Sequence, residues 1–165
     1  MVKTLLDMSE LQTVSRDETI AVDALVDEVL VDLEPLAQEK EIKLIGNCKD
    51  TTMVGSDILI YRMVYNLVEN AIKYNHFGGQ VTVTAYRSGK NICLSIEDTG
   101  SGIPPELKER IFEPFFRVDK SRSRQLGGVG LGLALVREIV RVHDGRITVQ
   151  SSPSGGTIFE VVFTQ

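Results

Sequence analysis

Cysteine and histidine are scarce in this sequence, and their scarcity excludes two kinds of site. The 165 residues include only Cys48, Cys93, His76 and His143 of these two types. Neither cysteine belongs to a CxxC pair, and no His and Cys set has the spacing of a zinc site. We expect both thiols to pack as small apolar groups in a reduced, cytosolic setting.

Long apolar runs and an excess of positive charge are also missing. No stretch approaches the roughly 20 apolar residues that cross a bilayer, and the first residues, MVKTLLDMSELQ, lack the apolar block of a signal peptide. The net charge is −5, from 18 basic and 23 acidic residues. This balance argues against nucleic acid as the main partner, because duplex binding needs several clustered cations.

What the chain does contain is a regular apolar pattern, with 42% apolar and 25% charged residues. Helical spacing predicts helices at 4–15, 19–39, 56–74 and 131–143, with Pro35 as a kink or a final turn. Alternation predicts strands at 42–48, 52–54, 81–86, 92–97, 146–151 and 157–163. Polar residues 16–18 are expected to be a linker, and residues 99–130 a loop with a turn near 105–111. Together these elements predict an α/β two-layer sandwich, with helices on one face of a mixed, mostly antiparallel sheet.

One predicted helix carries two amides and a lysine on the side opposite its apolar stripe. Within NLVENAIKYN, at 66–75, Asn66, Glu69, Asn70 and Lys73 fall three or four positions apart along this side. Two amides and a lysine could hold a hydrated Mg²⁺ and the phosphates bound to it, because Mg²⁺ prefers oxygen ligands and retains waters. An ordinary solvated helix face would show the same pattern, so this segment alone leaves both interpretations open.

The segment EDTGSGIP, at 97–104, leaves a predicted strand with an acidic side chain and two glycines. Asp98 at the strand end offers a carboxylate acceptor suited to an exocyclic amine such as that of adenine. Gly100 and Gly102 would let the backbone approach a flat ligand closely. A tight turn after an edge strand explains the segment equally well, since aspartate followed by glycine is common in turns.

Four glycines lead into the last predicted helix in GGVGLGLAL, at 127–135. Glycine-rich backbone at a helix N-terminus presents N–H donors to phosphate. The segment is not a P-loop, because no Lys-Ser/Thr pair follows it, and not a dinucleotide fingerprint, because no strand directly precedes it. A flexible linker is the alternative, but a linker does not explain the apolar helix that begins at once.

The segment FEPFFRVDKSRSR, at 112–124, gathers positive charge in an acidic protein. Its phenylalanines are candidate apolar anchors, and its cations are Arg117, Lys120, Arg122 and Arg124. A long loop anchored at one end and cationic at the other suits a mobile lid over a triphosphate. A basic surface patch for an acidic partner is the other interpretation.

In chain order, the four segments resemble the nucleotide-binding boxes of sensor histidine kinases, in the superfamily shared with DNA gyrase, the heat-shock-90 chaperone and the MutL proteins. The resemblance covers about residues 16–165. It implies the Bergerat-type ATP-binding fold, with ATP and Mg²⁺ as cofactors and a flexible lid. It also implies that residues 1–15 are a stub of the second helix of a dimerisation hairpin, and that residues 16–165 form the catalytic ATP-binding domain.

The resemblance also implies which residues would hold the metal and the phosphates. Asn70 would coordinate Mg²⁺, with Asn66 near it on the same helix face. Lys73 would approach the phosphates, and Asn66, Lys73 and Arg117 would act in catalysis. The backbone that would wrap the phosphates belongs to Gly128, Gly130, Leu131 and Gly132.

For the base, the resemblance implies that Asp98 accepts a hydrogen bond from the adenine amine. Tyr74 would lie near the adenine ring, and Thr157 would close the floor of the pocket behind Asp98. The remaining residues that would shape the base pocket are Gly100, Gly102 and Ile103.

One position separates transfer from hydrolysis. Hydrolytic members of the superfamily carry a glutamate four residues before the metal-binding asparagine, and this chain has Asn66 there. An amide cannot act as a general base at neutral pH. The resemblance therefore implies phosphoryl transfer to a presented nucleophile, in which positioning and charge neutralisation supply most of the catalysis. Glu69 is a nearby carboxylate but lies one turn away from that position, so we do not assign it as the base.

The family's phosphate acceptor is a histidine on the dimerisation hairpin, and neither His76 nor His143 has its sequence context. Both are expected to be loop or surface residues. We therefore expect a monomeric fragment that passes the γ-phosphate of ATP to a histidine outside this chain, with a response regulator downstream. It would be the cytoplasmic domain of a parent anchored in the bacterial inner membrane.

Two other functions would use the same segments. A serine kinase or anti-sigma switch protein would phosphorylate or sequester a protein partner, but the hairpin-like stub and the long Phe-rich segment favour the histidine kinase. A regulatory module could bind nucleotide without catalysis, and the combination of Asn70, Asp98 and the glycine segments argues against it.

Overall fold

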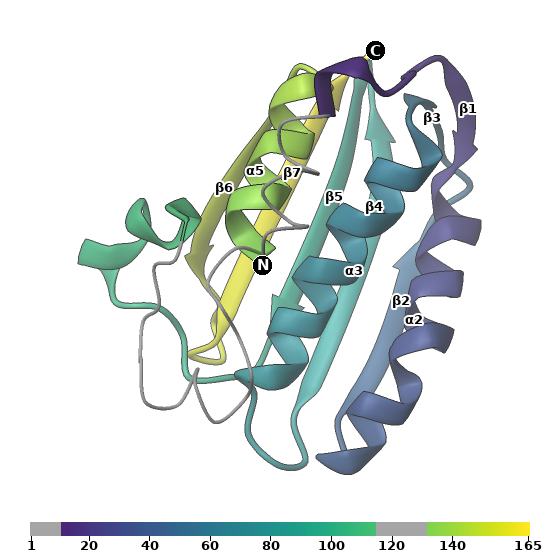
Figure 1. The fold of residues 1–165 in the computed structure, drawn as a ribbon. Helices are drawn as coiled ribbons and strands as arrows, with labels where there is room; N and C mark the ends of the chain where they lie inside the picture. Colours follow the sequence, from purple (N-terminus) through teal and green to yellow (C-terminus); the bar gives the residue numbers. More distant parts are fainter. Residues whose placement is uncertain (1–10, 115–131) are drawn as a thin grey trace.

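The computed structural model describes residues 11–114 and 132–165, whose arrangement is shown in Figure 1. Three short 3₁₀ helices are η1 (Leu11–Thr13), η2 (Pro105–Leu107) and η3 (Arg110–Phe112). The other elements, in chain order, are β1 (Glu18–Ala21), α2 (Val22–Glu39), β2 (Lys43–Cys48), β3 (Thr52–Gly55), α3 (Asp57–Lys73), β4 (Gln80–Ser88), β5 (Asn91–Asp98), α5 (Gly132–Val142), β6 (Gly145–Ser151) and β7 (Thr157–Thr164).

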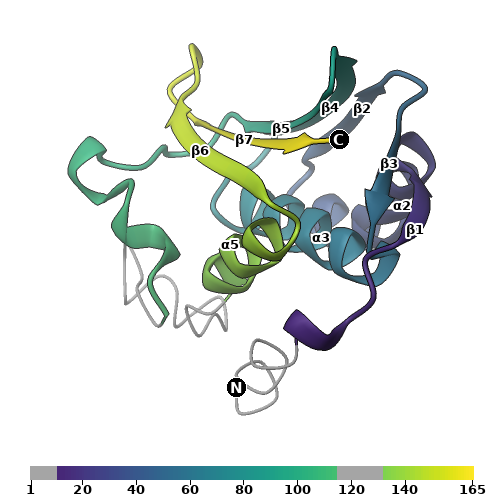
Figure 2. The ribbon, with the colours of Figure 1, turned by 90° about the horizontal axis from the view of Figure 1, so that it is seen from above.

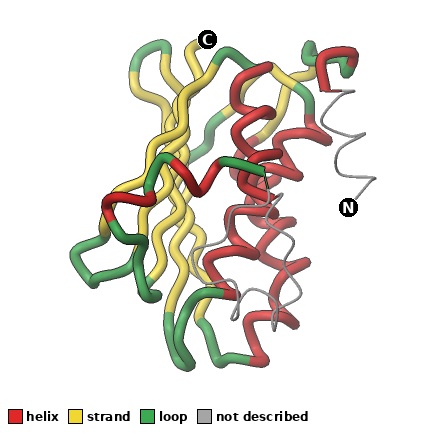
Figure 3. Tube along the Cα trace, turned by 60° about the vertical axis from the view of Figure 1, so that its left-hand side comes forward, coloured by secondary structure: helices red, strands yellow, loops and turns green. Residues whose placement is uncertain are grey.

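The main sheet has five strands in the order β2-β4-β5-β7-β6, and a separate pair is formed by β1 and β3. The β2–β4 pairing is parallel, and every other pairing is antiparallel. Helices α2, α3 and α5 lie together against one face of this sheet (Figure 2), so the helices and strands form two separate layers (Figure 3). The predicted two-layer sandwich with a mixed, mostly antiparallel sheet is confirmed.

Alternating residues of the central strands form the sheet side of the core. In β5 the side chains of Ile92, Leu94 and Ile96 are at most 2% exposed. The residues that alternate with them are half-buried, and Asp98 at the end of the strand is buried. The apolar stripe of α3 covers the three apolar side chains, with Met63 and Leu67 fully buried. Each such side chain stabilises the fold by about 1.5–3 kcal/mol relative to exposure, and the helix is thereby fixed with its opposite face outward.

One sequence-based boundary is wrong in the N-terminal part of the chain. The helix expected over 19–39 begins at Val22, because residues 18–21 form β1 instead. Ile20 is 2% exposed and pairs across the strands with Met53 of β3. Since this pairing joins distant segments, helical spacing within 19–39 could not indicate it. Pro35 lies inside α2, which continues to Glu39.

The remaining expected elements are found with small shifts at their ends. The turn near 105–111 consists of η2 and η3, and the last helix runs over Gly132–Val142. Of the helix expected at 4–15, residues 4–10 lie outside the described residues, and Leu11–Thr13 is a 3₁₀ turn. None of the helices in the described ranges combines the length and the apolar character that a membrane span requires.

Candidate functional site

Helix α3 presents the amides and the lysine of the candidate site along one partly exposed face. The helix begins where the Ser56 hydroxyl accepts a hydrogen bond from the Leu59 amide at 3.3 Å, which satisfies an otherwise unpaired N–H group. Asn66, Asn70 and Lys73 are each half-buried on the face opposite the core stripe. The apolar packing of the stripe therefore decides where these polar groups point.

Asn66 is a residue of α3 whose side chain faces the start of α5. Its Nδ2 donates to the carbonyl of Arg62, one turn earlier, at 2.8 Å. A Cβ atom added to Gly132 would lie 3.4 Å from the Asn66 Oδ1, so the amide oxygen faces the first residue of α5. The structure thus brings together two of the predicted site segments, whose residues 66 and 132 are 66 positions apart in the sequence.

Lys73 is paired within its own helix. Its Nζ lies 3.8 Å from a carboxylate oxygen of Glu69, and the two side chains are 28% and 29% exposed. An ion pair this open to solvent contributes little stability, about 0.3–0.5 kcal/mol for a helical i,i+4 pair. The ammonium group can therefore exchange Glu69 for another anion at small cost.

Asp98 is the most enclosed charged residue of the candidate site, with 9% of its surface exposed. Its Oδ1 accepts from the Gly100 amide at 2.8 Å and from the Thr157 amide at 3.2 Å. Burial raises the pKa of Asp98, and these two N–H donors act in the opposite direction. Among the described residues no partner is found for Oδ2, so one carboxylate oxygen is fixed in place and the other can accept a further hydrogen bond.

Two glycines permit the close packing around this carboxylate. A Cβ on Gly156 would lie 2.0 Å from the Asp98 carbonyl oxygen, and a Cβ on Gly100 would lie 2.7 Å from the Tyr74 carbonyl oxygen. Any side chain at either position would push the strand end away from its neighbours. The β5 end, the α3 end and the turn before β7 are therefore in direct backbone contact.

The other residues expected around a base lie in the same region. Tyr74 is the half-buried residue that ends α3, and Ile103 packs against the core. Gly102 faces the turn before β7, because a Cβ there would lie 2.6 Å from the Gly155 carbonyl oxygen. Thr157 is 5% exposed and contacts Asp98 through its amide. The expected residues Arg117, Gly128, Gly130 and Leu131 lie outside the described residues.

Two polar residues beside the site were missed by sequence reasoning, which attached nothing to Asn75 and Lys40. Asn75 is fully buried directly after Tyr74, and Lys40 donates from Nζ to the carbonyl of Asn75 at 2.7 Å. An amide that follows the last turn of a helix can bond nearby backbone groups, so the position of Asn75 carried a usable signal. Lys40 directly follows a different helix, α2, and no local pattern indicates its partner.

The expectation that His143 is a loop or surface residue is only partly correct. It lies in the turn after α5, but its ring is half-buried against Phe163, with the ring centroids 5.9 Å apart. Its Nδ1 bonds the Ile139 carbonyl at 2.8 Å and its Nε2 accepts from the Ser56 amide at 3.0 Å. Both ring nitrogens therefore serve the packing of α5 against the start of α3.

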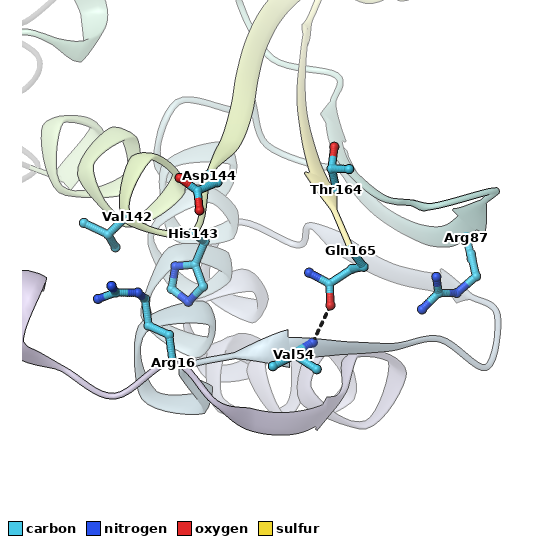
Figure 4. Close-up of a pocket in the computed structure, with 8 residues that line it drawn as sticks. All are labelled: Arg16, Val54, Arg87, Val142, His143, Asp144, Thr164 and Gln165. Atoms are coloured by element: carbon cyan, nitrogen blue, oxygen red, sulfur yellow. Dashed lines mark hydrogen bonds between the residues drawn. The ribbon is translucent and has the colours of Figure 1, made fainter.

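A hollow of about 560 Å³, drawn in Figure 4, lies away from Asp98. Its lining residues include Arg16, Arg87 and Thr164. Thr164 pairs with Asn91 at the start of β5, whereas Asp98 is at the other end of that strand. This hollow is consequently separate from the candidate site.

Similarity to known proteins agrees with this arrangement. Residues 55–165 match the histidine kinase-, DNA gyrase B- and HSP90-like ATPases. The sensor-like histidine kinase SenX3 of Mycobacterium tuberculosis (strain ATCC 25618 / H37Rv) is 39% identical over 163 residues, which cover 96% of this chain and 40% of SenX3. The catalytic domain of the histidine kinase ThkA, in a nucleotide-free form, gives a TM-score of 0.81 at 27% identity, covering 91% of this chain and 96% of that one.

Two solved complexes have the same fold as this chain. Full-length ShkA in complex with AMPPNP gives a TM-score of 0.81 at 25% identity, covering 98% of this chain and 34% of that one. ThkA in complex with the response regulator protein TrrA gives a TM-score of 0.80 at 26% identity, covering 99% of this chain and 46% of that one.

The chain belongs to the family of histidine kinase-, DNA gyrase B- and HSP90-like ATPases. Within this family its relatives are sensor histidine kinases, and the chain is a histidine kinase catalytic domain of a two-component system. It spans about 40% of the length of SenX3. The activities and partners of a whole sensor protein are therefore inferences from its relatives.

Proposed function

We propose that this domain binds ATP with Mg²⁺ and donates the γ-phosphate to a histidine outside the described residues. The observation that carries the proposal is the geometry of Asp98. Its Oδ1 is held by the amides of Gly100 and Thr157, and its Oδ2 has no partner among the described residues. A buried carboxylate fixed in this way can accept a hydrogen bond from one N–H donor of a ligand. The exocyclic amine of adenine provides such a donor.

The base would lie between the end of α3 and the loop after β5. Tyr74, half-buried after the last turn of α3, and Ile103, which packs against the core, would supply apolar surface for the base. Gly100 and Gly102 would let the loop backbone lie close to a flat ligand. Guanine carries a carbonyl where adenine carries its amine, and that carbonyl would face the Asp98 carboxylate with no proton between them. The site is therefore expected to discriminate against guanine by repulsion.

The phosphates would extend along the outer face of α3 toward the first turn of α5. Amide oxygens such as that of Asn70 are hard ligands that fit Mg²⁺, which supplies charge neutralisation at the phosphate oxygens when it is bound. Asn66 faces the same region, and Lys73 would leave Glu69 to contact a phosphate. Arg117 and the backbone of Gly128, Gly130, Leu131 and Gly132 are proposed to complete this part of the site.

The acceptor is proposed to come from another part of the parent protein. Both ring nitrogens of His143 are occupied by backbone groups, and His76 is exposed beyond the end of α3. Asn66 cannot act as a general base toward water, which favours transfer over hydrolysis. Residues 1–15 are proposed to be the end of the acceptor hairpin, and residues 16–165 the catalytic domain.

The relatives support our proposals for the partners and the location of the parent protein. The complex of ThkA with TrrA supports a response regulator as the downstream partner of the parent protein. The ShkA complex with AMPPNP supports an adenine nucleotide as the ligand. We place the domain on the cytoplasmic side of a parent protein anchored in the inner membrane, as expected for a sensor kinase.

The test is calorimetric titration of the chain with ADP and Mg²⁺, comparing the wild type with Asp98→Ala and Asp50→Ala. Asp98→Ala should abolish measurable binding, because the amine of the base loses a hydrogen bond to a charged acceptor, worth about 1.5–3 kcal/mol. The variant also removes the side chain that is fixed beside the base. Asp50 is exposed, so its variant should bind as the wild type does. Wild-type affinity in Asp98→Ala would remove Asp98 from the site.

Transfer itself is tested by adding a separately prepared acceptor hairpin and radiolabelled ATP. The label should move to the hairpin and should be stable to base but lost in acid, as a phosphohistidine is. Label that stays in ATP, or that reaches a serine on the hairpin, would contradict histidine kinase activity.

A further inference from the structure

Asn75 is fully buried, and its side-chain oxygen and nitrogen each have a hydrogen-bond partner. Its Oδ1 accepts from the His76 amide at 2.9 Å and from the Thr99 hydroxyl at 3.1 Å. Its Nδ2 donates to the Gln80 carbonyl at 3.1 Å. Because a buried amide without partners would cost about 1–3 kcal/mol, this arrangement strongly favours one position of the side chain.

Thr99 closes the same network from the other side. Its hydroxyl accepts from the Gln80 amide at 2.9 Å, and its own amide donates to the Gln80 carbonyl at 3.2 Å. Asn75, Thr99 and the Gln80 backbone thus form a closed ring of hydrogen bonds, called the clasp below. The clasp joins three segments: the end of α3, the start of β4 and the loop after β5.

The clasp lies directly behind the proposed base site. Asn75 follows Tyr74 in the chain, and Thr99 follows Asp98. The Gly100 backbone packs on the same two residues, since a Cβ there would lie 2.7 Å from the Tyr74 carbonyl oxygen and 3.2 Å from the Asn75 Cα. Any movement of Thr99 away from Asn75 would therefore carry Asp98 away from Tyr74.

We propose that Asn75 and Thr99 are positioning residues that hold Asp98 at the correct distance from Tyr74 for adenine. Neither touches the nucleotide; both act through the carboxylate and the ring that do. This inference rests on the proposed function, in which Asp98 accepts from the adenine amine. It extends that function by assigning base discrimination to two residues, the buried Asn75 and the half-buried Thr99, that lie outside the base pocket.

The chemistry of the clasp identifies the variants that separate its roles. Thr99→Val keeps the shape of the side chain and removes only the hydroxyl, whereas Thr99→Ser restores the hydroxyl. Thr84→Val is a matched control, because Thr84 is a half-buried threonine of β4 in the same sheet. Asn75→Ala is a coarser variant, since it also leaves the Gln80 carbonyl without its side-chain donor.

The first measurement is the affinity of each variant for ADP and for GDP, both with Mg²⁺, by calorimetry. Thr99→Val should lower the affinity for ADP about 5–10-fold, the loss expected for one net hydrogen bond. The affinity for GDP should fall by much less. The preference for ADP over GDP should therefore shrink in Thr99→Val and return in Thr99→Ser, while Thr84→Val keeps it. A variant that is merely less stable would lose affinity for both nucleotides by the same factor. That result, which leaves the preference for ADP over GDP unchanged, would overturn the proposal.

The second measurement needs no nucleotide. Amide hydrogen exchange at Gly100 and Thr157 reports the two bonds to the Asp98 Oδ1, and both should exchange about 5–10-fold faster in Thr99→Val but not in Thr99→Ser or Thr84→Val. Unchanged exchange would overturn the role of the clasp in fixing Asp98. If the wild type binds no ADP, the proposed function is wrong, and the exchange rates still decide whether the clasp positions Asp98.

Discussion

His143 shows how a single side chain acquires a role that depends on its charge. Its neutral ring accepts from the Ser56 amide, which an imidazolium could not do. Burial lowers the pKa of His143, as does Arg16 nearby, while its bond to the Ile139 carbonyl and the Asp144 carboxylate act in the opposite direction. The folded state therefore favours the neutral ring and releases a proton that the unfolded chain would keep.

The consequence is a pH-dependent contribution to stability. Because the folded pKa lies below the unfolded one, this contribution is fully present above the ordinary histidine pKa of about 6.5 and is lost as the pH falls through the folded pKa. Urea unfolding at pH 7.5 and pH 5.5 should show a smaller fall in stability for His143→Gln than for the wild type. His76 is exposed, so His76→Gln should lose as much stability between the two pH values as the wild type does. An equal loss of stability in all three proteins would contradict the role of His143.

Among the elements, the end of α3 is held by hydrogen bonds from a residue outside the helix. Lys40, from the residue after α2, donates from Nζ to the carbonyls of Ile72, Lys73 and Asn75 at 3.3, 2.9 and 2.7 Å. The Ile72 and Lys73 carbonyls belong to the last turn of α3, which carries the negative end of the helix dipole, and the Ile72 carbonyl also accepts from the Asn75 amide at 3.2 Å. A cation at this position therefore stabilises the end of the helix that bears Lys73 and Tyr74.

Lys40→Met keeps the aliphatic stem and removes the ammonium group. We expect the free energy of unfolding to fall by about 1.5–3 kcal/mol, the range for hydrogen bonds to a charged group, as measured by urea denaturation. Lys43→Met is the matched control, since Lys43 is an exposed lysine in the neighbouring strand β2. Equal losses in the two variants would show that the three carbonyl contacts add nothing.

The elements also show how far local sequence patterns reach. The apolar stripe of α3 and the strands β4 and β5 were predicted correctly, because each is encoded by residues within a few positions of one another. The strand β1 was predicted as part of a helix, because its partner β3 is distant in the chain. For the site, the sequence and its family resemblance indicated the Asp98, Gly100 and Thr157 group, which the structure brings into contact. They did not indicate Asn75 or Lys40, whose partners come from other elements.

For the molecule as a whole, nucleotide binding should raise the temperature of unfolding. A ligand present at 100 times its Kd stabilises the folded state by about 2.7 kcal/mol, which corresponds to roughly 5–11 °C for a domain of this size. Scanning calorimetry with ADP and Mg²⁺ should show this rise in the wild type. Asp98→Ala should show none, and a rise of the same size in that variant would place the nucleotide elsewhere.

Periodicity and turn residues were enough to predict the two layers and most element boundaries, because these features are encoded within short stretches of chain. The family resemblance of four such segments supplied the candidate site residues. The contacts that hold the site together came only from the folded arrangement. Asn75 meets Thr99 across 24 residues and Ser56 meets His143 across 87. Hydrogen bonds of this kind depend on strand register and helix packing, which place particular donors opposite particular acceptors.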